Sequence, residues 1–178
     1  MASASDIKLI VSDVDGVWTD GSIIYLGEQR EIKAFNVRDG LAAKLAQRAG
    51  IGVALVTSRH SPALERRARE LGITELHQGS ANKLDEVRRL AKKLDVELSQ
   101  ILYAGDDLPD LALMMTAGIS AAPSDASPEV RHAATWKLDS RGGGGAFREI
   151  VERLLRERGE WDRIIQEFAI GKPEAQSI

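Results

Sequence analysis

The 178-residue chain contains no cysteine. This absence excludes disulfides, thiolate zinc sites, iron–sulfur clusters and cysteine nucleophiles, and it fits a reducing compartment. Any metal ion must therefore be held by oxygen atoms or by histidine. Lysine and arginine number 24 against 27 aspartates and glutamates, so positive charge is not in excess. We therefore expect no basic surface for nucleic acid or for an anionic membrane.

Long apolar runs and targeting signals are also missing. The first apolar run, Ile7–Val11, ends before Asp13, and no stretch reaches the roughly 18 apolar residues of a membrane span. The opening residues Met1–Ser5 lack the basic region of a secretory signal. We expect a cytoplasmic protein without a membrane anchor.

The composition that remains is typical of a folded globular chain. Hydrophobic residues make up 43% and charged residues 29% of the sequence. A chain of this length usually forms one domain with a well-buried core. We predict a single domain over residues 1–170. The last residues, 171–178, include Pro173 and little apolar content, which predicts a flexible C-terminal tail.

Short apolar segments alternate with segments of helical period. Ile7–Ser12, Ile51–Val56 and Ile101–Ala104 are short and uniformly apolar, which predicts central strands of a parallel sheet. Strands that alternate with helices predict right-handed crossovers, and thus an α/β fold with a single Rossmann-like, doubly wound parallel sheet. Apolar residues three or four positions apart mark the covering helices: Leu41, Leu45 and Ala49; Leu64, Ala68 and Leu71; Leu84, Val87, Ala91 and Leu94; Leu111, Met114 and Met115.

One segment breaks the alternation after the first strand. Ser22–Tyr25 and Glu31–Phe35 are strand-like and flank the turn Leu26–Gln29, which predicts a projecting β-hairpin over about residues 20–36. Towards the C-terminus the pattern predicts a strand near Trp136–Leu138. Helices are expected after Pro128, around Phe147 to Leu155 and over Trp161–Phe168.

Polar residues follow the three predicted strands at their carboxyl ends, the edge where open α/β sheets bind ligands. Taken singly, each is also explained by a turn, a helix cap or a solvated surface position. Their convergence on one sheet edge favours a functional site. The residues are Asp13, Asp15, Thr57, Ser58, Asp106, Asp107 and Asp110, and Lys83 opens the helix before the third strand.

The chemistry of these side chains favours a divalent cation and a phosphate. Clustered carboxylates raise one another's pKa unless a cation lies among them, and Mg²⁺ prefers oxygen ligands and commonly meets phosphate. One carboxylate can then attack phosphorus to form an aspartyl phosphate, and a second, two residues further on, can act as general acid and then base. Thr57 can donate a hydrogen bond to the phosphoryl oxygens, while Lys83 neutralises their charge.

Four motifs, in this order, resemble those of the haloacid dehalogenase-like phosphatases: Asp13-x-Asp15, Thr57, Lys83 and Gly105-Asp106-Asp107-x-x-Asp110. The resemblance implies that Asp13 is the nucleophile and Asp15 the acid and base. It also implies Mg²⁺ held by Asp13, the backbone carbonyl of Asp15 and Asp106. Asp107 or Asp110 would support this site.

Most members of this superfamily carry a cap domain, but the intervals between the motifs of this sequence are too short to contain one. These intervals run from Asp13 to Thr57 and from Lys83 to Asp106. A site without a cap is open to water and unselective, so we expect a hairpin from a neighbouring subunit to close it. The spacing therefore predicts an oligomer.

Longer stretches resemble one capless group within the superfamily, the phosphatases that release phosphate from 3-deoxy-D-manno-octulosonate 8-phosphate, a phosphorylated sugar acid of lipopolysaccharide synthesis. The resemblance implies a homotetramer in which hairpins and tails of neighbouring subunits complete each site. The stretches that carry it are Asp13–Gly21, Lys33–Gly40, Gln78-Gly79, Gly105–Asp110 and Gly142–Glu149.

Substrate recognition is assigned to Arg59, Arg67 and Ser58, because a guanidinium fork suits the carboxylate of a sugar acid. In related 2-keto-3-deoxynononate 9-phosphate phosphatases, glutamate is typical at the position of Arg59, so this arginine favours the eight-carbon substrate. Asp15–Gly21 and Trp161–Phe168 instead resemble the nine-carbon group, and Ser58 replaces a common glycine. A non-catalytic oligomerisation module is the third alternative, which the intact acidic motifs argue against.

Overall fold

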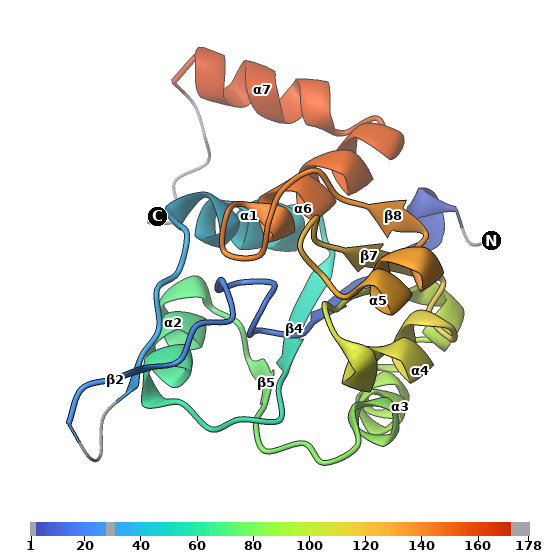
Figure 1. The fold of residues 1–178 in the computed structure, drawn as a ribbon. Helices are drawn as coiled ribbons and strands as arrows, with labels where there is room; N and C mark the ends of the chain where they lie inside the picture. The colour runs from blue at the N-terminus through green and yellow to red at the C-terminus, as the bar shows by residue number, and fades with distance from the viewer. Residues whose placement is uncertain (1–2, 28–30, 172–178) are drawn as a thin grey trace.

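The computed structural model describes residues 3–27 and 31–171. Its centre is a six-stranded sheet in the order β5-β4-β1-β6-β7-β8 (Figure 1). Every neighbouring pair in it is parallel. This order grows outwards in both directions from β1 and β6, which confirms the doubly wound α/β fold. The strands are β1 (Leu9–Ser12), β4 (Gly52–Val56), β5 (Glu75–His77), β6 (Ile101–Ala104), β7 (Ile119–Ala122) and β8 (Trp136–Lys137).

Helices cover both faces of the sheet. Helices α1, α2 and α6 pack on one face, α3, α4 and α5 pack on the other, and α7 packs against α6. In the part of the chain that the structure describes, no helix has the length and apolar character to cross a bilayer. The helices are α1 (Val37–Arg48), α2 (Pro62–Leu71), α3 (Lys83–Leu94), α4 (Leu111–Met114), α5 (Pro128–Ala133), α6 (Ala146–Glu157) and α7 (Trp161–Ala169).

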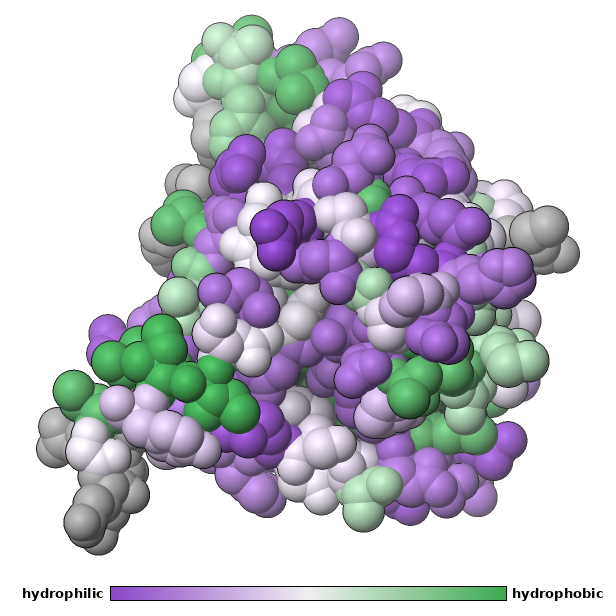
Figure 2. Space-filling view, viewed as in Figure 1, coloured by the Kyte–Doolittle hydropathy of each residue, from purple (hydrophilic) through white to green (hydrophobic). Residues whose placement is uncertain are grey.

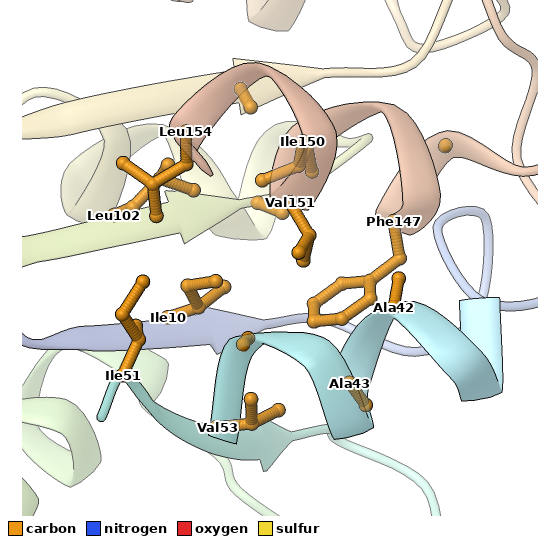
Figure 3. Close-up of a cluster of buried hydrophobic side chains, with 14 of the residues drawn as sticks. Ile10, Ala42, Ala43, Ile51, Val53, Leu102, Phe147, Ile150, Val151 and Leu154 are labelled. Carbon is orange, nitrogen blue, oxygen red and sulfur yellow. The ribbon is translucent and has the colours of Figure 1, made fainter. Parts of the chain in front are cut away.

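Two hydrophobic clusters hold these layers together. Successive strand residues point to opposite faces, so Ile10 belongs to one cluster while Leu9 and Val11 belong to the other. Figure 3 shows Ile10 of β1 below Ile150 and Val151 of α6, with the Phe147 ring beside Ala42 of α1. Because both faces of the sheet are buried, its central strands are uniformly apolar. This pattern is what made them predictable from the sequence.

The hairpin predicted after the first strand is present as a small separate sheet. Strands β2 (Ile24–Tyr25) and β3 (Glu31–Ile32) pair antiparallel and project from the body of the molecule (Figure 1). Both strands are shorter than predicted. Residues 28–30 of the predicted turn and 172–178 of the predicted tail lie outside the described residues, so the tail and the domain limit at residue 170 stay predictions.

Two strands escaped sequence analysis, β5 and β7. The Glu75–His77 strand is only half buried at the sheet edge, and its three residues carry no apolar run. The Ile119–Ala122 strand is fully buried but consists mostly of small residues, without the β-branched or aromatic enrichment that marks a strand. Pairing with β4 and β6 creates these strands, so tertiary contacts override weak local preference.

Candidate active site

The site lies where the sheet order reverses, between the carboxyl ends of β1 and β6. Asp13 follows β1, Asp106 follows β6, and Thr57 follows the adjacent β4. A cavity of about 320 Å³ opens at this edge. Its lining contains every residue predicted for the site except Arg67. Parallel strands place their carboxyl ends together, which is why residues distant in sequence meet here.

Lys83 joins two of the acids. As the first residue of α3 it is buried, and its Nζ lies 2.8 Å from Oδ2 of Asp13 and 2.7 Å from Oδ1 of Asp110. Burial lowers the pKa of Lys83, but the two carboxylates raise it by more, so the pKa lies above its ordinary value. The lysine therefore stays cationic beside Asp13, where its charge can attract the negative charge of a phosphoryl group.

Asp110 is a structural anchor of this edge. It is fully buried, and its Oδ1 also accepts a hydrogen bond of 2.6 Å from the Tyr103 hydroxyl. Its Oδ2 accepts hydrogen bonds from the backbone N–H groups of Asp106 and Asp107, at 3.0 and 3.3 Å. With both oxygens engaged in these contacts and with Lys83, Asp110 fixes the loop that presents Asp106. Support of a metal site by Asp110 stays a prediction.

Three carboxylates crowd together: one oxygen each of Asp13, Asp106 and Asp110 lie within 4.8 Å of one another. Burial raises the pKa of Asp13 to about 6. The positive charge of Lys83 lowers this pKa, and the negative charge of Asp110 raises it. Burial, and then the charges of Asp13 and Asp110, raise the pKa of Asp106 to about 8. Negative charge is in excess here, and a hard divalent cation with oxygen ligands would relieve it.

The carboxylate of Asp15 is not part of this cluster and contacts two cations instead. Its Oδ1 accepts a hydrogen bond from Lys33 Nζ, and its Oδ2 lies 3.9 Å from Arg59 Nε. Glu31 pairs with both of these cations. Burial alone would raise the pKa of Glu31, but its contacts with Arg59 and Lys33 lower it below its ordinary value.

Glu31 and Lys33 were not among the site residues predicted from the sequence. Both come from the returning arm of the hairpin, which folds back onto Asp15. The available signal was their spacing, because residues two positions apart in an extended segment share one face. Their charges gave no hint, since charged residues on a projecting hairpin are usually solvated.

The loop after β4 supplies the uncharged part of the pocket. Thr57 is buried, its N–H donates to the carbonyl oxygen of His77, and its Oγ1 accepts a hydrogen bond of 3.2 Å from Arg59 N. Ser58 is exposed at the pocket wall. The structure thus brings Thr57 and Ser58 to the acids, as their place at a strand end predicted, and Arg59 lines the same cavity.

Arg67 is the one predicted site residue that lies elsewhere. It sits on α2, where its Nη1 lies 3.3 Å from Oε2 of Glu70. Its guanidinium also packs so closely over Gly40 that a Cβ atom there would lie 2.1 Å from Nη2 of Arg67. Within one chain, Arg67 does not reach the cavity that contains Asp13.

A glycine-rich loop before α6 supports the loop after β1. Gly143 N–H donates to the Val17 carbonyl at 3.0 Å, and the Asn36 side chain donates to the Gly143 carbonyl at 3.2 Å. A Cβ atom on Gly142 would lie 2.1 Å from the carbonyl oxygen of Gly16. The backbones approach too closely for any side chain there, so this loop fixes the position of the loop after β1.

Comparison with known proteins agrees with this geometry. A family model described as haloacid dehalogenase-like hydrolase matches residues 68–150. The 3-deoxy-D-manno-octulosonate 8-phosphate phosphatase of Escherichia coli K12 is 42% identical over 163 residues, covering 91% of this chain and 86% of the relative. The chain belongs to the 3-deoxy-D-manno-octulosonate 8-phosphate phosphatase family. This membership confirms the resemblance that the motifs indicated.

Solved structures of the 3-deoxy-D-manno-octulosonate 8-phosphate phosphatase family share the whole fold. The Moraxella catarrhalis enzyme, in complex with a magnesium ion, a phosphate ion and KDO, superimposes with a TM-score of 0.90 at 41% identity, covering 93% of this chain and 95% of that one. The cobalt-bound Haemophilus influenzae enzyme gives a TM-score of 0.89 at 38% identity, covering 93% and 98%. Metal binding in these relatives fits the acidic cluster described above.

Proposed function

We propose that this protein is a Mg²⁺-dependent phosphatase that converts 3-deoxy-D-manno-octulosonate 8-phosphate to the free sugar acid and phosphate. The observation that carries the proposal is the convergence of Asp13, Asp15 and Lys83 in one cavity, in a chain 42% identical to an enzyme of that name. The acids lie where an open α/β sheet binds its ligands. This activity belongs to the synthesis of lipopolysaccharide sugars.

Asp13 acts as the nucleophile. A carboxylate oxygen of Asp13 forms a bond to phosphorus as the bond from phosphorus to the sugar oxygen breaks, giving an aspartyl phosphate. Asp15 gives its proton to the departing sugar oxygen, then takes a proton from the water that attacks phosphorus and releases Asp13. Lys83 and the Thr57 hydroxyl stabilise the charge on the phosphoryl oxygens.

The residues present fit a magnesium ion. Asp13, Asp106 and the backbone carbonyl of Asp15 would hold it, because they offer oxygen atoms at an edge where negative charge is in excess. When bound, the ion supplies positive charge that neutralises the phosphate and the acids together. Asp110 holds the Asp106 loop in place, and Asp107 supports it by capping the short turn that follows.

Recognition of the sugar acid is assigned to Arg59, with Ser58 beside it at the pocket wall. A guanidinium group meets a carboxylate with two parallel hydrogen bonds, which makes Arg59 suited to the acid group of the substrate. Arg67 lies outside its own chain's cavity, so its assigned role requires that it serve the site of a neighbouring subunit. The eight-carbon substrate follows from the family and from Arg59.

We further propose a homotetramer, in the cytoplasm, with sites completed by neighbouring subunits. The support is the projecting hairpin, where Ile24, Tyr25 and Leu26 are exposed. Figure 2 shows hydrophobic surface on this projection. Apolar side chains gathered on a protruding ribbon favour burial against another molecule. The absence of cysteine fits a reducing compartment.

The deciding experiment measures phosphate release with Mg²⁺ from matched eight-carbon and nine-carbon ulosonate phosphates, with EDTA as the metal control. We expect a higher kcat/KM for the eight-carbon compound and no release in EDTA. A preference for the nine-carbon compound would instead make the protein a 2-keto-3-deoxynononate or sialic acid 9-phosphate phosphatase. Release from neither compound would leave the non-catalytic oligomerisation module as the reading.

A further inference from the structure

A closed chain of charges lies beside the proposed acid and base. Lys33 contacts both Asp15 and Glu31. Arg59 contacts the same two acids, Glu31 through Nη2 and Asp15 through Nε. The Lys33 side chain is 2% exposed and that of Glu31 is 16% exposed, whereas that of Arg59 is 38% exposed, so water reaches these pairs mainly at Arg59. Two cations and two anions balance one another. The hairpin arm that carries Glu31 and Lys33 is thereby tied to the pocket.

This arrangement leaves one edge of Arg59 half occupied. The N–H of Nε and one N–H of Nη2 form the edge that meets a carboxylate with two hydrogen bonds. Glu31 takes Nη2 through its Oε2, while Nε is buried without a hydrogen-bond partner. Asp15 Oδ2 and Glu31 Oε1 are also buried without one. A polar ligand is therefore expected here, because buried polar atoms are normally paired.

We propose that Glu31 is a specificity-determining residue: its carboxylate holds Arg59 until the carboxylate of the sugar acid replaces it. The incoming group gains both N–H donors of the edge, whereas Glu31 uses one. The displaced Glu31 keeps a cationic neighbour, because its Oε1 lies 3.3 Å from Lys33 Nζ. The exchange leaves no charge unpaired.

Because Glu31 occupies Arg59, only a ligand with a carboxylate can bind this arginine. A phosphate ester without a carboxylate leaves the pair of Glu31 and Arg59 in place and gains nothing from the arginine. A small anion, held at one point, competes poorly against an internal carboxylate that is already in position. This inference rests on the proposed function only in taking the ligand to be a sugar acid.

The test is calorimetric titration with free 3-deoxy-D-manno-octulosonate, which has the carboxylate but no phosphate and needs no turnover. Arg59→Gln should weaken binding roughly tenfold, the effect of losing a charged hydrogen-bond partner. Glu31→Gln should tighten binding about threefold, the worth of a partly exposed ion pair. In the Arg59→Gln background, Glu31→Gln should give no tightening, because its effect passes through Arg59.

Glu31→Asp provides a second route. It keeps the charge but shortens the side chain, so it should release Arg59 and tighten binding as Glu31→Gln does. Glu157→Gln is the matched control, since it removes one carboxylate from an arginine pair on the surface of α6, and its dissociation constant should equal that of the wild type. Circular dichroism checks that each variant is folded.

Two results would overturn the inference. One is a folded Glu31→Gln protein that binds the sugar acid with a dissociation constant equal to or higher than that of the wild type. The other is equal tightening with and without Arg59. Turnover of the phosphorylated sugar acid, measured in parallel, separates the two proposals: wild-type protein that binds the sugar acid as described but releases no phosphate contradicts the proposed function alone.

Discussion

A Cβ atom on Gly16 would lie 2.0 Å from Oδ2 of Asp106, far inside contact distance. Gly16 also has a φ of +85°, in the left-handed region that favours glycine. The loop after β1 therefore presses its backbone against a carboxylate of the loop after β6. The two loops form one site because residue 16 has no side chain.

Gly16→Ala should disable the site without unfolding the protein. The added methyl group must push Asp106 away, and displacement of a catalytic group by about 1 Å costs roughly 100-fold in rate. We expect kcat/KM to fall by about that factor, with weaker activation by Mg²⁺. Gly50→Ala is the control, since Gly50 also has positive φ but nothing lies within 4 Å of its Cβ position. Equal losses in both variants would show that backbone strain, not the Asp106 contact, is responsible.

Asp13→Asn should abolish turnover while the fold remains. The amide has almost the same shape as the carboxylate but cannot attack phosphorus, so we expect a loss of roughly 10⁴-fold or more. Steady-state phosphate release measures the loss, and circular dichroism checks the fold. Turnover within about tenfold of the wild type would rule out Asp13 as the nucleophile.

Removal of Mg²⁺ should make stability depend on pH. Burial, followed by the charges of Asp13 and Asp110, raises the pKa of Asp106 to about 8 from an ordinary 3.8. Between these values the folded chain binds more protons than the unfolded chain, so stability falls as the pH rises towards 8. Above about pH 6, Asp106 should dominate, because burial raises the pKa of Asp13 and Asp39 to about 6.

Thermal melting in EDTA at about pH 6 and pH 8.5 tests this dependence. We expect a lower melting temperature at the higher pH, by roughly 2–4 °C for each kcal/mol lost. Mg²⁺ should restore the higher value, and Asp106→Asn should flatten the dependence in EDTA. A wild-type melting temperature that does not change with pH in EDTA would mean that ionisation of Asp106 does not destabilise the fold.

Arg59→Gln should affect the sugar-acid substrate more than a generic phosphate ester. Loss of a charged hydrogen-bond partner should lower kcat/KM for the eight-carbon ulosonate phosphate by roughly 10- to 100-fold. Glutamine is preferable to glutamate here, because a new carboxylate would face Glu31 and Asp15. The comparison substrate is p-nitrophenyl phosphate. Equal losses on both compounds would remove the recognition role of Arg59.

A charge on the hairpin should weaken assembly. Ile24→Asp places a carboxylate on the exposed apolar ribbon, where burial against another subunit would then cost desolvation. We expect light scattering after size-exclusion chromatography to show a smaller species with reduced turnover. Leu94→Lys, at the exposed end of α3, is the control. An unchanged mass for the Ile24→Asp protein would place the interface elsewhere.

Much of the site could be predicted from sequence because its residues follow strands of clear character. The apolar runs before Asp13, Thr57 and Asp106 are buried on both faces, so their pattern is nearly continuous. Parallel strands then bring the residues after them to one edge. Arg67 could not be placed in the same way, since a helical position gives no measure of its distance from that edge.

Local sequence patterns were enough to predict the α/β fold and the acids at its edge, because strong apolar periodicity and strand polarity are local properties. Which charged side chains contact one another depends on how the folded chain packs. Glu31 and Lys33 reach Asp15 and Arg59 because a short ribbon folds back across the pocket, and Asp110 rather than Asp15 joins the carboxylate cluster because Tyr103 and Lys83 hold it there. Such pairings depend on three-dimensional packing, which no local pattern of residues specifies.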